Sequence, residues 1–307
     1  MKVSLKVATY NIGTPGGPDN IALKHLPYNE DRINQAERNA AARVGSLGID
    51  VLCLQEVYKK DRPFIQVLRD NGFAHIYFQN DTAIASRLPL SHVKDIGCKS
   101  KSHPEEVGLQ GQDIAGISFK IGKISIAIAS THGWGFNLEP IGSTDDPIQC
   151  RADRENRVYA KTYTKETISL LNSTKADLKL ACGDNNNNTH NFTEPFEMYT
   201  NAGFTIHEPA EPTNHNPKQP HYPDRVIDHI ISGSSLSPIN ESSSFFRKLI
   251  NRIVNIFISR SKIIAVTPPT IPPGFDYVEG QNCSDYKPVI MKIKVLVQES
   301  FFRRLFS

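Results

Sequence analysis

Short apolar segments with a two-residue period recur along the whole chain, and polar side chains stand at their ends. The first segment, 2–11, has apolar residues at Val3, Leu5 and Val7 with polar residues between them. Such alternation predicts a β-strand with one buried face. Further strands are expected at 49–56, 74–79, 81–90, 113–121, 123–132, 177–184, 224–233, 262–266 and 288–296. So many strands have to pack as sheets, on each other or under helices.

Four segments between these strands have helical character instead. Residues 30–48 are rich in Ala, Glu and Arg and end at a glycine, and 61–72 has a proline in its first turn. Two more helices are expected at 154–172 and 193–203. The order of elements favours an α/β fold, a four-layer α-β-β-α sandwich of two mainly antiparallel sheets. No repeat or linker is evident, so we expect residues 1–307 to form a single domain.

Composition limits the class of protein only loosely. The hydrophobic content of 39% and charged content of 22% support a sizeable core and exclude wholesale disorder. A net charge of +3 permits a polyanionic partner without requiring one. No segment reaches the roughly 20 apolar residues of a membrane span, and the start of the chain alternates like a strand rather than resembling a signal peptide.

The cysteines point to a reducing environment. They are odd in number and scattered along the chain, which is typical of reduced and mostly buried thiols rather than of disulfides or a zinc site. We therefore expect a cytosolic protein, or one exported by a dedicated secretion system. The five are Cys53, Cys98, Cys150, Cys182 and Cys283.

A set of polar residues shares one location, at or beside the ends of the expected strands. Taken singly, each has a simpler explanation as a turn residue, a helix cap or a structural histidine. Together, strand ends gathered on one edge of a sandwich can build one rigid site. The set comprises Asn11, Glu56, His132, Asp184, Asn186, Asp228 and Asp285.

The sequence blocks around these residues resemble, in order, the signature of the endonuclease/exonuclease/phosphatase superfamily. That family includes deoxyribonucleases of the pancreatic type, apurinic endonucleases, neutral sphingomyelinases and inositol-polyphosphate phosphatases. The resemblance covers nearly the whole chain and bears more on fold than on substrate, because the family shares a site and varies its loops. The blocks are ATYNIG, LCLQEVY, AIASRLPL, STHGWG, CGDNNN, RVIDHII and SDYKPVI.

The resemblance implies metal-assisted hydrolysis of a phosphate ester, with Mg²⁺ as the cofactor and Mn²⁺ as the alternative. Glu56 is the best candidate for a metal ligand, Asn11 would either ligate through its amide oxygen or orient Glu56, and Asp285 would be a third ligand. These oxygen donors suit a hard cation that keeps several waters.

The remaining roles also come from the resemblance. Asp184 would position or deprotonate the attacking water, and Asn186 would hold a phosphate oxygen. His132, when protonated, would stabilise negative charge in the transition state.

One position departs from the family pattern, since Tyr286 stands where a catalytic histidine is expected, beside Asp285. In the family, the acid matching Asp228 orients that histidine. A phenol titrates near 10 and makes a poor base at neutral pH. A histidine from the loop after the fourth helix could replace it, namely His207, His215 or His221; His229 should face away from Asp228, because strand neighbours alternate. Otherwise Tyr286 acts as a hydrogen-bond donor, or the protein binds a phosphate ligand without turnover.

Two further segments lie outside the pattern. Residues 238–262 form a probable insertion in which 245–258 reads as a basic amphipathic helix, and the tail 298–307 has aromatic and basic residues at 301–306. Each could simply cover the protein surface, or contact a membrane or a partner. We therefore expect a metal-dependent phosphoesterase acting on a phosphodiester in nucleic acid or a phospholipid headgroup. The alternative is a catalytically impaired effector that binds a phosphate-bearing ligand, a membrane or a partner protein.

Overall fold

The fold was analysed in a computed structural model of the chain. The structure describes residues 2–13, 29–57, 60–89, 91–98, 113–122, 124–133, 147–186, 192–213, 226–234, 262–273 and 287–297.

The first sheet has six strands and carries both ends of the described chain. Its order is β11-β12-β1-β2-β4-β3. Only β1 and β2 run parallel; the other neighbours are antiparallel. The strands are β1 (Lys2–Asn11), β2 (Val51–Gln55), β3 (His75–Gln79), β4 (Thr82–Ser86), β11 (Lys262–Val266) and β12 (Val289–Val297).

The second sheet repeats this plan with the order β5-β6-β7-β8-β10-β9. Here only β7 and β8 run parallel. Both sheets are thus mainly antiparallel, as predicted, and each has one parallel pair at its centre. The strands are β5 (Ser91–Asp95), β6 (Ala115–Ile121), β7 (Ile124–His132), β8 (Leu178–Asp184), β9 (Phe204–His207) and β10 (Asp228–Ser234).

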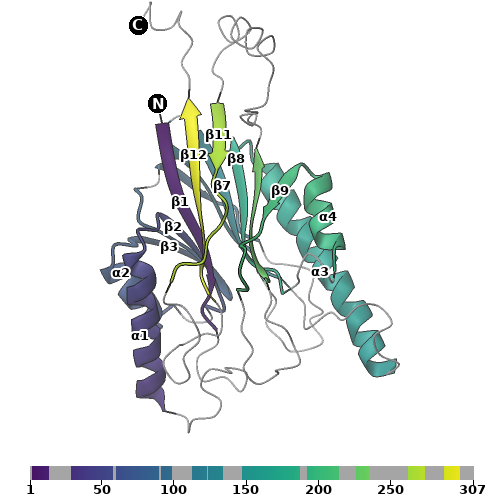
Figure 1. The fold of residues 1–307 in the computed structure, drawn as a ribbon, viewed down its shortest axis with the longest axis horizontal. Helices are drawn as coiled ribbons and strands as arrows, with labels where there is room; N and C mark the ends of the chain where they lie inside the picture. The colour runs from purple at the N-terminus through teal and green to yellow at the C-terminus, as the bar shows by residue number, and fades with distance from the viewer. Residues whose placement is uncertain are drawn as a thin grey trace, which may run out of the picture.

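Helices cover the outer faces of the two sheets (Figure 1). Helices α1 (Glu30–Ser46) and α2 (Pro63–Asp70) share an apolar cluster with the first sheet, and α3 (Pro147–Ser173) and α4 (Glu194–Asn201) cover the second. The α1 start is fixed by the Asn29 side chain, which accepts a hydrogen bond from the Arg32 N–H at 3.0 Å. The four-layer α-β-β-α prediction is confirmed.

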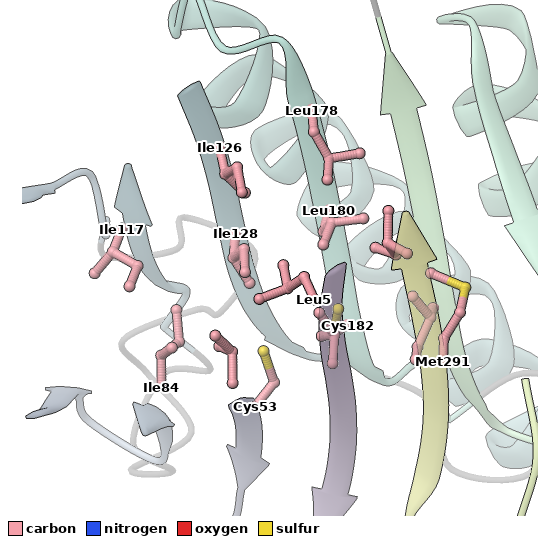
Figure 2. Packing of buried hydrophobic residues seen from close by; sticks show 14 of the residues in the cluster. Leu5, Cys53, Ile84, Ile117, Ile126, Ile128, Leu178, Leu180, Cys182 and Met291 are labelled. Atoms are coloured by element: carbon pink, nitrogen blue, oxygen red, sulfur yellow. The ribbon is translucent and has the colours of Figure 1, made fainter. Parts of the chain in front are cut away.

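The central core lies between the sheets and follows the alternation of the strands. Leu5 and Val7 of β1 face the second sheet, whereas Ala8 and Tyr10 face the helices. Figure 2 shows Ile126 and Ile128 of β7 beside Leu178, Leu180 and Cys182 of β8 in this inter-sheet layer. The same two-residue rule determines which polar residues face inward at the strand ends.

Some element boundaries differ from the sequence prediction. Helix α3 begins at Pro147 rather than near residue 154, and strands β5 and β9 were not predicted. Strand β5 is a largely exposed edge strand of sequence SHVKD, so it lacks the apolar alternation that reveals a strand. Strand β9 has only four residues, too few to show a period.

The thiol prediction holds for the cysteines whose side chains are described. Cys53 and Cys182 are buried and Cys98 is partly buried, and all three are free thiols. No helix in the described part of the chain has the length and apolar character needed to cross a membrane. The side chain of Cys150, all of Cys283, and the segments 245–258 and 298–307 lie outside the described residues.

Candidate active site

The carboxyl ends of the two parallel strand pairs meet at one end of the sandwich. Asn11 at the end of β1 pairs with Gln55 at the end of β2, and His132 at the end of β7 pairs with Asp184 at the end of β8. Strand β1 lies against β8, and β2 lies against β7. Four strands therefore place polar side chains at this one end of the sandwich, which we call the rim.

Asn11 connects the two sheets across this rim. Its amide nitrogen donates to Glu56 Oε1 at 3.0 Å and to Asp184 Oδ2 at 3.0 Å, and its oxygen accepts from the Gly13 N–H at 2.9 Å. The side chain is fully buried. Asn11 thus contacts both carboxylates through its amide nitrogen. This arrangement suits the orienting of Glu56, which is one of the two roles that the sequence left open.

Glu56 follows the last residue of β2 and adopts a left-handed backbone conformation with φ of 60°. This region is costly for a residue with a side chain, by about 1–2 kcal/mol. Its side chain is only half-buried, in contrast to the fully buried Asp184. Glu56 is thus a carboxylate at the rim that can reach both protein and solvent.

Asp184 accepts hydrogen bonds on both oxygens. Oδ1 accepts from the Asn186 backbone N–H at 2.6 Å, and Oδ2 accepts from Asn11. Burial raises the pKa of Asp184, and the nearby His132 and the two hydrogen bonds partly counteract that rise. A raised pKa makes a carboxylate a better proton acceptor near neutral pH.

Asn186 has its own anchor at the rim. Its backbone is left-handed, with φ of 51°, and its amide nitrogen donates to the Gly133 carbonyl at 3.0 Å. That bond uses one of two N–H donors of the amide. The turn after β8 is therefore tied to the turn after β7.

His132 forms an ion pair with Asp81, a residue that the sequence analysis missed. Its Nδ1 lies 2.6 Å from Asp81 Oδ2, and both side chains are buried. Burial alone would lower the pKa of His132, but the hydrogen bond and charge of Asp81, helped by Glu56 and Asp184, raise the pKa to about 9. His132 is consequently an imidazolium at neutral pH. Asp81 directly precedes β4, so the strand-end rule that found the other acids could have found it.

Asp228 begins β10 and pairs in register with Asp184 of β8. Thr213 fixes this strand start, because its hydroxyl accepts from the backbone N–H groups of Ile227 and Asp228, both at 3.1 Å. The Thr213 carbonyl accepts from the Lys287 N–H at 2.8 Å. Thr213 therefore brings the start of the last strand to the side of Asp228. Nothing in the Pro- and His-rich sequence around Thr213 signalled this role.

The other candidates lie elsewhere or outside the described residues. Asp285, Tyr286, His215 and His221 are outside them. His207 bonds Ser232 Oγ at 2.7 Å within the second sheet. His229 packs on Phe196 of α4 and contacts Glu208 at 3.2 Å, so its ring lies on the helix-covered face of the second sheet, as expected from the alternation with Asp228.

The donor set at the rim is compatible with a hard cation. Among the described residues, no group of three or more His, Cys, Asp or Glu side chains is arranged to hold a metal ion. Magnesium often takes only one or two carboxylates, with waters and substrate phosphate completing its shell. Glu56 can supply one carboxylate, and the predicted second, Asp285, belongs to the segment just before Lys287.

Solved structures of other proteins share this architecture. An endonuclease/exonuclease/phosphatase from Bacteroides vulgatus is 13% identical, with a TM-score of 0.58 over 95% of this chain and 98% of that one. Sphingomyelinase C from Streptomyces griseocarneus is 14% identical, with a TM-score of 0.59 over 94% and 99%. Truncated TDP2 from Caenorhabditis elegans is 13% identical, with a TM-score of 0.57 over 94% and 97%.

The chain has the endonuclease/exonuclease/phosphatase fold. The resemblance seen in the sequence blocks is thereby confirmed at the level of fold. No family model matches the sequence, and no curated protein matches it. The endonuclease/exonuclease/phosphatase fold is thus retained here at low sequence identity, and the substrate has to be argued from the site itself.

Proposed function

We propose that the protein is a Mg²⁺-dependent phosphoesterase that hydrolyses a phosphodiester, with Mn²⁺ as an alternative ion. The observation that carries this proposal is Asn11, whose single amide joins Glu56 and Asp184 across the two sheets. Two carboxylates joined by one neutral donor, beside an imidazolium, supply the charges that a cation, an attacking water and a phosphate would require.

The chain's own residues supply the proton and charge chemistry. Asp184, buried and with a raised pKa, accepts a proton from the attacking water. His132, kept protonated by Asp81, stabilises the negative charge that develops on the phosphoryl oxygens. Asn186 offers a neutral N–H donor that holds a phosphate oxygen without repelling it.

A bound Mg²⁺ would be held by Glu56 and Asp285, and it would polarise the phosphoryl oxygen and neutralise developing charge. Asn11 keeps the Glu56 carboxylate turned toward the rim. The Asp228 carboxylate would accept a hydrogen bond from the Tyr286 hydroxyl. Tyr286 would then act as a hydrogen-bond donor in place of the family's histidine.

The substrate class follows the family resemblance and the fold relatives. One relative is a sphingomyelinase, and TDP2 from D. rerio has been solved with a single-strand DNA product. We propose a nucleic acid or a phospholipid headgroup as the substrate. Contact with a membrane surface through 245–258 and 301–306 would favour the lipid.

Hydrolysis assays test the proposal directly. Purified protein would be given a bis-aryl phosphate, plasmid DNA, single-stranded DNA, sphingomyelin vesicles and phosphoinositides, with Mg²⁺, with Mn²⁺ or with EDTA. We expect turnover that needs the metal and is lost in Asp184→Asn and Glu56→Gln. Asp177→Asn is the matched control, because Asp177 lies next to the opposite end of β8, bonded to Ser125. Metal-independent turnover, or turnover that survives Asp184→Asn, would contradict the mechanism.

Tyr286 favours a second candidate, an effector that binds a phosphate-bearing ligand without hydrolysing it. General acid–base help is worth about 10²–10⁴ in rate, and a tyrosine supplies little of it at neutral pH. Absence of all hydrolysis, together with a gain in Tyr286→His, would support the effector. Sedimentation with phospholipid vesicles, with and without residues 245–258, tests the membrane contact.

A further inference from the structure

A buried arginine lies behind the two turns that carry Asn11 and Glu56. Arg62 stands at the N-cap position of α2, and only 4% of its surface is exposed. Its guanidinium pairs with Glu37 of α1 at 3.0 Å, and Glu37 is itself 1% exposed. A buried charge has to be offset by a partner and by further hydrogen bonds, because its transfer out of water costs several kcal/mol per ion.

The other donors of Arg62 reach the backbone of both turns. Nη1 donates to the Glu56 carbonyl at 2.6 Å, and Nη2 donates to the Gly13 carbonyl at 3.0 Å. One planar fork therefore joins the turn after β1 to the turn after β2. A lysine could not do this, because its ammonium is a compact point charge rather than a planar fork.

The contact at Glu56 acts on a strained residue. The peptide bond that follows Glu56 is held at both ends, since its carbonyl accepts from Arg62 and the Val57 N–H donates to the Asp81 carbonyl at 2.7 Å. Fixing this peptide fixes the left-handed backbone of Glu56 and hence the direction of its side chain. Without the arginine, the residue can relax to a more common conformation that points elsewhere.

The contact at Gly13 acts on Asn11. The Gly13 N–H donates to Asn11 Oδ1, which leaves the amide nitrogen of Asn11 facing Glu56 and Asp184. Arg62 holds the carbonyl of the same glycine. It thus supports the orientation of both predicted metal-site residues from behind.

Glu37 completes the arrangement by fixing the arginine. Its carboxylate accepts from Arg62 Nε at 3.3 Å and from the Phe64 N–H at 3.2 Å, so it also ties the first turn of α2 to α1. Through Glu37 and Arg62, helices α1 and α2 are therefore connected to the two turns at the rim.

We propose that Arg62, held by Glu37, is a positioning residue that sets Glu56 and Asn11 for metal binding. This inference rests on the proposed metal-dependent function. Residues that support metal ligands from behind typically contribute about 10–100-fold to metal affinity.

The decisive variant is the double substitution Glu37→Leu with Arg62→Met. Replacing both partners avoids leaving one buried charge unpaired. The Glu56 and Gly13 carbonyls and the Phe64 N–H still lose their side-chain partners, so this variant should unfold below the wild-type temperature even without metal. It also lacks the contacts that hold both turns. Leu171→Ala is the matched control, because it truncates a buried leucine of α3 that packs with the second sheet, and it should lose stability without touching either turn.

Mn²⁺ binding to the purified full chain is measured by electron paramagnetic resonance, alongside thermal unfolding with and without Mn²⁺. We expect about 10–100-fold weaker Mn²⁺ binding in the double variant, restored turnover at high Mn²⁺, and unchanged affinity in Leu171→Ala. Arg62→Lys, which keeps the charge, should also bind Mn²⁺ more weakly. This single variant replaces the double variant in the test if the double variant does not fold. Wild-type affinity in these Arg62 variants would overturn the inference alone, whereas a wild-type protein that binds no Mn²⁺ would overturn the proposed metal function as well.

Discussion

The ion pair between Asp81 and His132 gives a sharp prediction about pH. Folding raises the pKa of His132 from 6.5 to about 9, against the effect of burial. At about 1.4 kcal/mol per pKa unit, this shift corresponds to about 3 kcal/mol of folding free energy. Because the folded-state pKa is the higher one, that stabilisation is complete below pH 6.5 and is lost as the pH rises through 9.

Asp81→Asn removes the main partner of the imidazolium. Burial then dominates, so the pKa of His132 should fall well below 9 and the loss of stability between neutral pH and 9 should flatten. Urea unfolding of both proteins across this pH range measures the slope of the unfolding free energy against pH. The contributions of the other titrating groups cancel in the difference between the two slopes. Imidazole proton shifts in NMR spectra report the titration of His132 directly.

The same substitution should affect turnover if the proposed mechanism holds. A neutral His132 cannot offset charge on the phosphoryl oxygens, so kcat at neutral pH should fall by about 10²–10³, the usual cost of losing one such donor. Asp177→Asn, which leaves His132 untouched, should change neither the titration nor kcat. Equal slopes in wild type and Asp81→Asn, or a His132 that still titrates near 9 in the variant, would refute the reasoning.

Three further predictions concern packing and the rim. Asn11→Ala leaves two carboxylates without their shared donor and should cost about 1–3 kcal/mol in urea unfolding; unchanged stability would mean that the bridge is not formed. Gly183→Ala should prevent folding, as judged by circular dichroism, because the added Cβ would overlap the Thr131 carbonyl. In the control Gly203→Ala, the added Cβ meets no atom within 4 Å, so the variant should lose only about 1–2 kcal/mol of unfolding free energy, because its φ is 83°. The Cys53 thiol, whose pKa burial raises well above its usual value, should resist alkylation in the native protein, and mass spectrometry should find it modified only after unfolding; rapid native modification would contradict its burial.

The sequence alone determined the layers and the inward faces. Alternation along β1 puts Leu5, Val7 and Asn11 on one face, and the same rule separates Asp228 from His229. These features are local, since side chains in a strand repeat every two residues whatever the strand packs against. The sequence could therefore supply the residue types at the rim and the order of the elements.

Only the tertiary structure decided which of these residues touch. Asp81 meets His132 because β4 packs against β7 of the other sheet, and Arg62 supports Glu56 because α1 and α2 pack together beside β2. Such contacts join residues far apart in the chain, so no local period encodes them. The pKa of His132 and the strained backbone of Glu56 follow from that packing, because burial and neighbouring charge exist only after the sheets have closed on each other.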